Sequence, residues 1–159
     1  MMPMFKKLKV TRIEDEDPSS FSSESNRIHL SDGKSPDEHW IVKDASPVIL
    51  ISNEKYGLAP QCYQLSDQLY GVGVNERFFL VERGEIRTDS KLPCRFYELI
   101  HVQEPYMVIH HETGFICLTF DGDAHWDKGG DLIQDWRIEG DRLLFETWGG
   151  KKMSVRLPR

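Results

Sequence analysis

The chain lacks any run of about 18 or more apolar residues, so no transmembrane helix is expected in its 159 residues. Residues 1–7 also lack the long apolar stretch of a secretory signal. Cysteine is scarce: Cys62, Cys94 and Cys117 are odd in number and show no C-x-x-C spacing, which indicates free thiols in a reducing compartment. These absences predict a cytoplasmic protein that does not associate with a membrane.

An excess of basic residues is also missing, since the net charge is −6 and the isoelectric point is near 5.5. A protein that binds duplex nucleic acid needs clustered Lys and Arg to displace counterions, so we expect no nucleic-acid partner. Large apolar side chains are plentiful, because 39% of the residues are hydrophobic and there are 4 Trp, 8 Phe and 5 Tyr. These suffice to close one core without a disulfide or a metal.

Motifs for phosphate and calcium are incomplete. The sequence Gly71-Val72-Gly73 lacks the third glycine and the helix start that a phosphate cradle needs, so we expect a flexible turn over residues 71–75. The pair Asp121 and Asp123 does not continue into a calcium loop, since the next alternate residue is His125 and no glutamate closes the loop. We therefore predict no cofactor.

The N-terminal part of the chain is polar. Residues 14–36 contain seven serines, few apolar residues and no steady period, so they bury too little surface to offset the entropy of ordering. We interpret residues 1–36 as a polar arm with a first strand at residues 5–13, and residues 37–159 as a single β domain.

Short β-branched and aromatic runs, separated by turn residues, follow from residue 39 onward. This pattern, without long helical periods, predicts a mainly β fold: an antiparallel sandwich or a curved meander sheet with at most one short helix. The best place for that helix is residues 61–70, where Tyr63, Leu65 and Leu69 share a face. The predicted runs are residues 40–42, 48–51, 78–81, 96–102, 106–111, 115–120, 132–138, 143–148 and 153–157.

One internal echo is present, because Phe78, Leu80 and Gly84 recur 38 residues later as an Ile, a Leu and a Gly. That period is near the period of propeller blades, but this length gives too few blades to close a ring. Only three positions match, so we assign no family.

Two hairpins have readable registers. In the last hairpin, a three-residue loop over residues 149–151 pairs Leu143 with Leu157 and Phe145 with Val155, which puts apolar residues on one face. A two-residue loop would mix the faces, so we prefer the three-residue loop.

The hairpin at residues 112–114 is ambiguous. A two-residue loop over Thr113 and Gly114 sets His110 opposite Cys117, whereas a type I turn with a glycine bulge sets His110 opposite Ile116. The second register is favoured because it gives the cleaner core, with one face made of Tyr106, Val108, His110, Ile116, Leu118 and Phe120.

Residues of the types that bind metals or act as nucleophiles are densest between residues 110 and 127. Neighbouring strand residues point to opposite faces, so His110 and His111 cannot serve one site. Neither Cys94 nor Cys117 is at a predicted helix start, where a thiol would be activated, and Cys117 alternates with apolar residues like a core position. Because these ligand-type residues are nevertheless dense here, the alternative hypothesis is a metal- or small-ligand-binding β domain, or an enzyme, that uses the His110/His111/His125 region.

The strongest surface signal is charge segregation. Residues 121–141 hold seven acidic residues against two basic ones, whereas residues 142–159 hold five basic residues against one acidic residue. Two solvated faces that neutralise each other explain this pattern, and so does an acidic recognition surface with aromatic anchors. The leading hypothesis is a small intracellular module that binds a basic protein, for example a bacterial toxin-immunity or inhibitor protein. Its predicted partner-binding residues are Asp123, Trp126, Asp127, Asp131, Asp135 and Trp136.

Overall fold

The computed structural model describes residues 5–13, 27–34, 37–54 and 58–159 of the chain. These residues form sixteen strands in four sheets and no helix, so the prediction of a mainly β fold is confirmed. Within the described part of the chain, no helix is long and apolar enough to cross a membrane.

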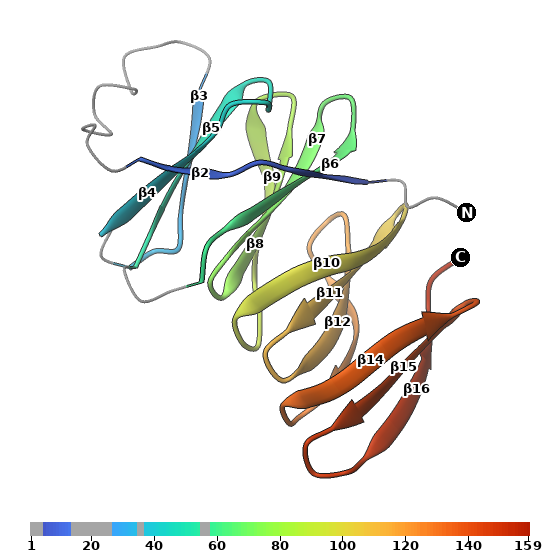
Figure 1. Cartoon of the computed structure of the whole chain (residues 1–159). Helices are drawn as coiled ribbons and strands as arrows, with labels where there is room; N and C mark the ends of the chain where they lie inside the picture. The colour runs from blue at the N-terminus through green and yellow to red at the C-terminus, as the bar shows by residue number, and fades with distance from the viewer. Residues whose placement is uncertain (1–4, 14–26, 35–36, 55–57) are drawn as a thin grey trace.

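The four sheets follow one another in a row, from the blue and cyan strands to the red strands in Figure 1. Sheet 1 has the order β2 (Thr11–Ile13), β4 (Glu38–Val42), β5 (Val48–Asn53), β3 (Arg27–Ser31). Sheet 2 has the order β1 (Lys6–Leu8), β6 (Gln61–Ser66), β7 (Leu69–Val74), β8 (Arg77–Glu82), β9 (Glu85–Lys91). Sheet 3 has the order β10 (Phe96–Gln103), β11 (Tyr106–His111), β12 (Gly114–Thr119), β13 (Ala124–Gly129). Sheet 4 has the order β14 (Ile133–Glu139), β15 (Arg142–Thr147), β16 (Lys152–Arg156).

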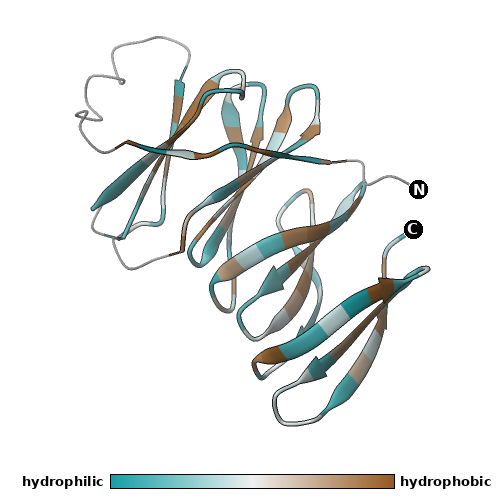
Figure 2. Cartoon of the chain, viewed as in Figure 1, coloured by the Kyte–Doolittle hydropathy of each residue, from teal (hydrophilic) through white to brown (hydrophobic). Residues whose placement is uncertain are grey.

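Every strand pair is antiparallel except β3 with β5, which are parallel. Most neighbours in a sheet are also neighbours in sequence, joined by short turns, so sheets 2 to 4 are largely meanders. In Figure 2, β14 is hydrophobic at its two ends, with hydrophilic and near-neutral bands between them.

The core consists of three apolar clusters, one between each pair of neighbouring sheets. Cluster 1 joins sheets 1 and 2, cluster 2 joins sheets 2 and 3, and cluster 3 joins sheets 3 and 4. Along β12, Ile116 and Leu118 belong to cluster 2, whereas Phe115 and Cys117 belong to cluster 3. Sheets 2 and 3 are therefore buried on both faces, and successive side chains of a strand enter different clusters.

The 38-residue echo falls on equivalent strands but not on equivalent faces. Phe78 and Leu80 lie on β8, and Ile116 and Leu118 lie on β12; each strand is the third of a four-stranded run in its sheet. All four side chains meet in cluster 2, where the two strands face one another. The echo thus reflects a shared strand order and not a repeated unit with the same orientation.

The predicted helix at residues 61–70 is wrong, because these residues form β6, a turn and the start of β7. Cys62 and Tyr63 are adjacent and both buried, which is the pattern of a strand covered on both faces. Without a solvent face, the alternation that identifies a strand in the sequence disappears.

The flexible turn expected at residues 71–75 is also wrong, since β7 runs through Gly71 and Gly73. A Cβ on Gly73 would lie 2.2 Å from Cδ1 of Phe96, and one on Gly71 would lie 2.7 Å from Cζ of Phe78. Glycine stands at both positions because aromatic rings pack directly on the strand.

The polar arm is only partly described. Residues 14–26 and 35–36 lie outside the described residues, but residues 27–31 form β3, and Leu30 is buried in cluster 1. The predicted first strand at residues 5–13 contains two strands, β1 in sheet 2 and β2 in sheet 1. The division of the chain between residues 36 and 37 stays a prediction.

The hairpin β11–β12 has neither of the two registers considered. Its loop is Glu112-Thr113, and His110 lies opposite Phe115. The favoured register was chosen to collect apolar residues on one face, but both faces of β12 are buried. Hydrophobic patterning fixes the register only where one face meets water, so it did not discriminate here.

The hairpin β15–β16 differs from its predicted register by two residues. Leu143 lies opposite Val155 and Phe145 opposite Met153, because the loop is Trp148-Gly149-Gly150. A shift of two residues leaves every side chain on its predicted face. Leu143, Phe145 and Leu157 are accordingly buried together in cluster 3, with Val155 packed against them.

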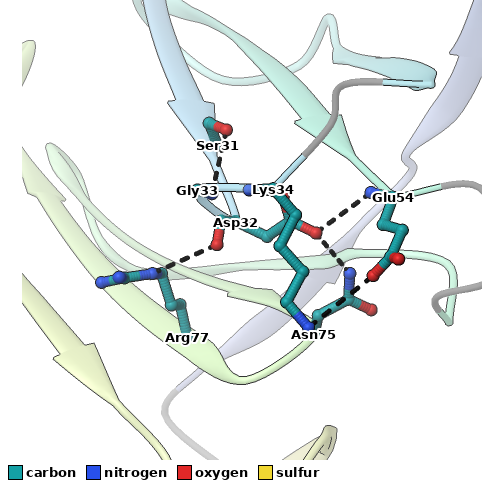
Figure 3. Close-up of polar contacts among 7 residues, drawn as sticks. All are labelled: Ser31, Asp32, Gly33, Lys34, Glu54, Asn75 and Arg77. Atoms are coloured by element: carbon teal, nitrogen blue, oxygen red, sulfur yellow. Dashed lines mark hydrogen bonds and ion pairs between the residues drawn. The ribbon is translucent and has the colours of Figure 1, made fainter.

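Hydrogen bonds of a buried aspartate connect sheet 1 to sheet 2 (Figure 3). Asp32 follows β3 and is 6% exposed. Its carboxylate accepts hydrogen bonds from the Asn75 side-chain amide at 2.6 Å and from the backbone N–H groups of Lys34 and Glu54, each at 3.0 Å. The Arg77 guanidinium donates to the Asp32 carbonyl at 3.4 Å. Since Asn75 and Arg77 belong to sheet 2 and its β7–β8 turn, these bonds connect the two sheets beside cluster 1.

The register of β15 predicts a large loss of stability when one residue is truncated and a small loss for the residue beside it. Phe145→Ala is expected to lower the free energy of unfolding by about 3–5 kcal/mol, because it deletes a buried ring from cluster 3. Leu144→Ala, on the outer face, should cost less than about 1 kcal/mol. Urea unfolding of both variants measures the difference, and equal losses would contradict the assigned faces.

The Asp32 contacts predict that Asp32 contributes more to the free energy of unfolding than Asp89, which also contacts Arg77. Asp32→Ala is expected to cost about 2–3 kcal/mol, since three donors lose a charged acceptor. Asp89→Ala is the matched control, because Asp89 forms an exposed ion pair with the same Arg77 at 3.0 Å and should contribute less than about 1 kcal/mol. The same urea titrations apply, and an Asp32→Ala loss no larger than the control would refute the fastening role.

Candidate functional site

The six predicted partner-binding residues are distributed over two edge strands, the loop between them and the turn that precedes the first. Trp126 and Asp127 lie on β13, with Asp123 in the turn before it, and β13 is an outer strand of sheet 3. Asp135 and Trp136 lie on β14, an outer strand of sheet 4, and Asp131 lies between β13 and β14.

The two tryptophans of this set are not exposed anchors. Trp126 is half-buried and shares a hollow of about 380 Å³ with residues of β16 and the chain after it. Trp136 is half-buried on β14, with its ring 5.9 Å from the rings of His110 and Phe115. Since β14 and β16 are opposite edges of sheet 4, the two rings cover cluster 3 at separate edges.

Much of the acidic charge is neutralised locally. Asp127 lies 3.3 Å from the His111 imidazole, and Asp141 pairs with Arg156 at 3.4 Å and Arg159 at 2.6 Å. Two further pairs are Glu139 with Arg137 at 2.7 Å and Asp121 with Arg87 at 3.3 Å. Three of the seven acidic residues thus have arginine partners, which favours the interpretation of mutually neutralising faces for that part of the stretch. Burial lowers the pKa of His111, so its imidazole is neutral near pH 7 and does not offset the charge of Asp127.

Asp131 organises a different feature at the end of sheet 4. Its carboxylate accepts the N–H of Leu132 at 2.8 Å and the N–H of Gly149 at 3.0 Å, and Trp148 donates its N–H to the Leu132 carbonyl at 2.9 Å. These bonds hold the β13–β14 loop against the β15–β16 turn. We call residues 131, 132, 148 and 149 the sheet 4 tip.

The tip presents two large apolar side chains to solvent. Trp148 is 67% exposed, the most exposed large hydrophobic residue in the described part of the chain, and Leu132 is 46% exposed. The first cross-strand pair beside the tip is Ile133 with Thr147, and the next row is charged and consists of Asp135, Glu146 and Lys152. Behind this row, the outer face of sheet 4 has a hollow of about 350 Å³ lined by Arg137, Leu144 and Ser154 among others.

Trp148 is not among the partner-binding residues that the sequence predicts. The predicted anchors Trp126 and Trp136 pack against cluster 3 instead. The available signal was that Trp148 immediately precedes Gly149-Gly150. A side chain in a turn has no facing strand to cover it, so an aromatic residue there is exposed unless another segment folds over it.

The histidines of the alternative hypothesis do not converge. His110 enters cluster 3 and lies near Tyr97, Phe115 and Trp136, whereas His111 contacts Asp127 on the other face of sheet 3. His125 packs in a tilted arrangement against Tyr106, at the opposite end of β11, with ring centroids 4.9 Å apart. The predicted opposite orientation of His110 and His111 is therefore correct. Among the residues that the structure describes, no three His, Cys, Asp or Glu side chains are grouped to hold a metal.

The cysteines have the environment of core residues. Burial raises the pKa of the Cys117 thiol to about 11 and that of the Cys62 thiol to about 12, so both are protonated near neutral pH. Cys94 is half-buried, and its sulfur accepts a hydrogen bond from the Thr113 hydroxyl at 3.1 Å. The Nδ1 atom of His111 is engaged by the Thr113 N–H at 3.3 Å, so that imidazole is not aimed at Cys94.

Comparisons with known proteins identify no family. No protein-family model matches the chain, and no curated protein matches it. Among solved structures, the chain is similar to one described as "Crystal structure of the computationally designed Ika4 protein", with a TM-score of 0.43 and 7% sequence identity over 86% of this chain and 93% of that chain. A likeness this distant carries no argument about function, which therefore rests on the residues of the chain itself.

Proposed function

We propose that the chain is a protein-binding module that recognises its partner through the sheet 4 tip. The observation that carries this proposal is the exposure of Trp148 and Leu132 in two turns that Asp131 holds together. Tryptophan is among the residues that dominate binding energy at interfaces, and an anchor that is already ordered loses little entropy on binding.

The charges beside the tip favour a basic partner. Asp131 lies in the tip itself, and Asp135 and Glu146 lie in the charged row beyond it, with Lys152 at the far end of that row. The whole chain carries a net charge of −6, which adds a long-range attraction for a basic protein. The partner therefore combines a basic surface with an apolar pocket for the Trp148 ring. Of the acidic residues predicted from the sequence, this proposal keeps Asp131 and Asp135. The anchoring role expected of Trp126 and Trp136 is assigned to Trp148.

One concrete form of such a module is a toxin-immunity or inhibitor protein that covers the basic active site of its target. The proposed location is the cytoplasm, which is supported by three cysteines that are all free. Small size and acidic charge support this form as well, since masking a basic surface requires little more than a complementary face.

Affinity capture tests the role of Trp148. Immobilised wild type, Trp148→Ala and Ile86→Ala are exposed to a lysate of the source organism, and the retained proteins are quantified by mass spectrometry. Ile86 is the matched control because it is also a highly exposed hydrophobic residue, 48% exposed, but lies on β9 of sheet 2. A basic protein retained by wild type and Ile86→Ala should be lost with Trp148→Ala, by at least about tenfold. Equal retention by all three proteins, or no specific retention by wild type, would refute the proposal.

Association kinetics with the captured partner test the charge. Asp135→Asn is expected to lower the association rate at low salt and to flatten its salt dependence, because an exposed rim charge acts on encounter. Asp123→Asn, in the exposed turn before β13, removes the same charge elsewhere and serves as the control. An equal effect of both variants would show that only the net charge matters and not the position of Asp135.

A further inference from the structure

His110 is an anomaly in the contact between sheets 3 and 4. Its side chain is buried, with 8% of the residue exposed, yet neither Nδ1 nor Nε2 has a hydrogen-bond partner. The imidazole stacks on Phe115 with ring centroids 4.7 Å apart, and the rings of Tyr97 and Trp136 approach edge-on at 5.2 Å and 5.9 Å. Burying two unpaired polar atoms costs free energy, so the packed arrangement holds a destabilising group at its centre.

This contact attaches the C-terminal sheet to the rest of the molecule. The buried apolar residues of the sheet 4 strands, Leu143 and Phe145, belong to cluster 3, which is shared with sheet 3 alone. Sheet 4 is also the last in the row, so it can separate without opening clusters 1 or 2 (Figure 1). Terminal units that contact one neighbour are the first to open in such arrays.

The charged groups around His110 provide little stabilisation for a positive charge on its imidazole. Glu98 on β10 is the nearest carboxylate, with its oxygen 3.9 Å from Nδ1, beyond hydrogen-bond distance, and its side chain is 46% exposed. The adjacent His111 disfavours a positive charge on His110. On β13, Lys128 lies opposite Phe115, the residue on which His110 stacks. On β14, the charged neighbours of Trp136 are Asp135 and Arg137, which stand on the outer face of sheet 4.

We propose that proton uptake by His110 releases sheet 4 from sheet 3, so that acidification opens the C-terminal end of the molecule. The functional consequence rests on the proposed role of the tip: an opened sheet 4 no longer presents Trp148 and Leu132 in fixed positions. Protonation acts at the contact itself, because an imidazolium between three rings has no acceptor within hydrogen-bond distance there, whereas separation exposes both N–H groups to water.

The direction of the pH effect follows from linkage. Burial, together with the neighbouring His111, lowers the pKa of His110 to about 4, whereas the ordinary value is 6.5. The separated state therefore binds more protons than the packed state, and the packed contact loses stability as the pH falls through 6.5 toward 4. With these two values, the equilibrium between packed and separated sheets shifts toward separation by about 20-fold between about pH 7 and about pH 5.

Hydrogen exchange read by mass spectrometry tests the proposal on the free protein, without any partner. Wild type and His110→Phe are compared at about pH 7 and about pH 5, with rates corrected for intrinsic exchange. In wild type, protection of the β14, β15 and β16 peptides should fall by about 20-fold at the lower pH, while β7 and β8 keep their protection. In His110→Phe, which keeps an aromatic ring but takes up no proton, protection of sheet 4 should be unchanged between the two values.

A second histidine supplies the matched control. His101 on β10 lies 3.1 Å from the Pro158 carbonyl, and a glutamine amide can donate to the same carbonyl, so His101→Gln should retain the pH dependence of wild type. Should His110→Phe fail to fold, NMR titration of His110 in wild type decides the matter, because the proposal requires a folded-state pKa far below 6.5. A folded-state pKa at or above about 6, unchanged protection of sheet 4 in wild type, or an equal loss in all four sheets would overturn it. Since no partner is present, none of these results depends on the recognition role of the tip.

Discussion

The fold depends on burial of apolar surface between consecutive sheets. Three clusters fill the three contacts in the row, and they require sheets 2 and 3 to be apolar on both faces. Each of these sheets is therefore stabilised only by its neighbours, because neither face is suited to water. The polar fastening at Asp32 and the glycines of β7 serve the same contacts: the first connects sheets 1 and 2, and the second lets the rings of Phe78 and Phe96 lie against a strand.

This arrangement limits where a partner can bind. Faces inside the row are covered, so the described surface consists of sheet edges, turns and the outer faces of the end sheets. The edges of sheets 3 and 4 carry charged residues and bulges, which protect an exposed strand from pairing with another chain. The sheet 4 tip differs from these edges because it exposes a tryptophan and a leucine on turns with a fixed conformation.

His110 lies in the contact that attaches sheet 4, and with it the sheet 4 tip, to sheet 3. A leucine or phenylalanine in its place would satisfy cluster 3 without orphaned polar atoms, and the stacked position on Phe115 already suits an aromatic ring. Where a buried polar side chain among packed rings has no hydrogen-bond partner, a functional reason is the first to test. The end of the row that carries the tip is thus also the end whose attachment contains the titratable group.

The sequence by itself determined the β class, the strands of the C-terminal half apart from β13, and the face assignment of β15 and β16. In that hairpin one face is charged and the other apolar, so alternation carries the information. Only the tertiary structure decided the strands at residues 61–74, the register of β11–β12 and which tryptophans are exposed to solvent. Both faces of those strands are covered, which removes the period of two from the sequence, and the exposure of Trp126, Trp136 and Trp148 depends on which sheet packs beside each. The acidic stretch was readable as composition, but its division between two sheet edges is a consequence of how sheets 3 and 4 pack, and no pattern within the stretch encodes that contact.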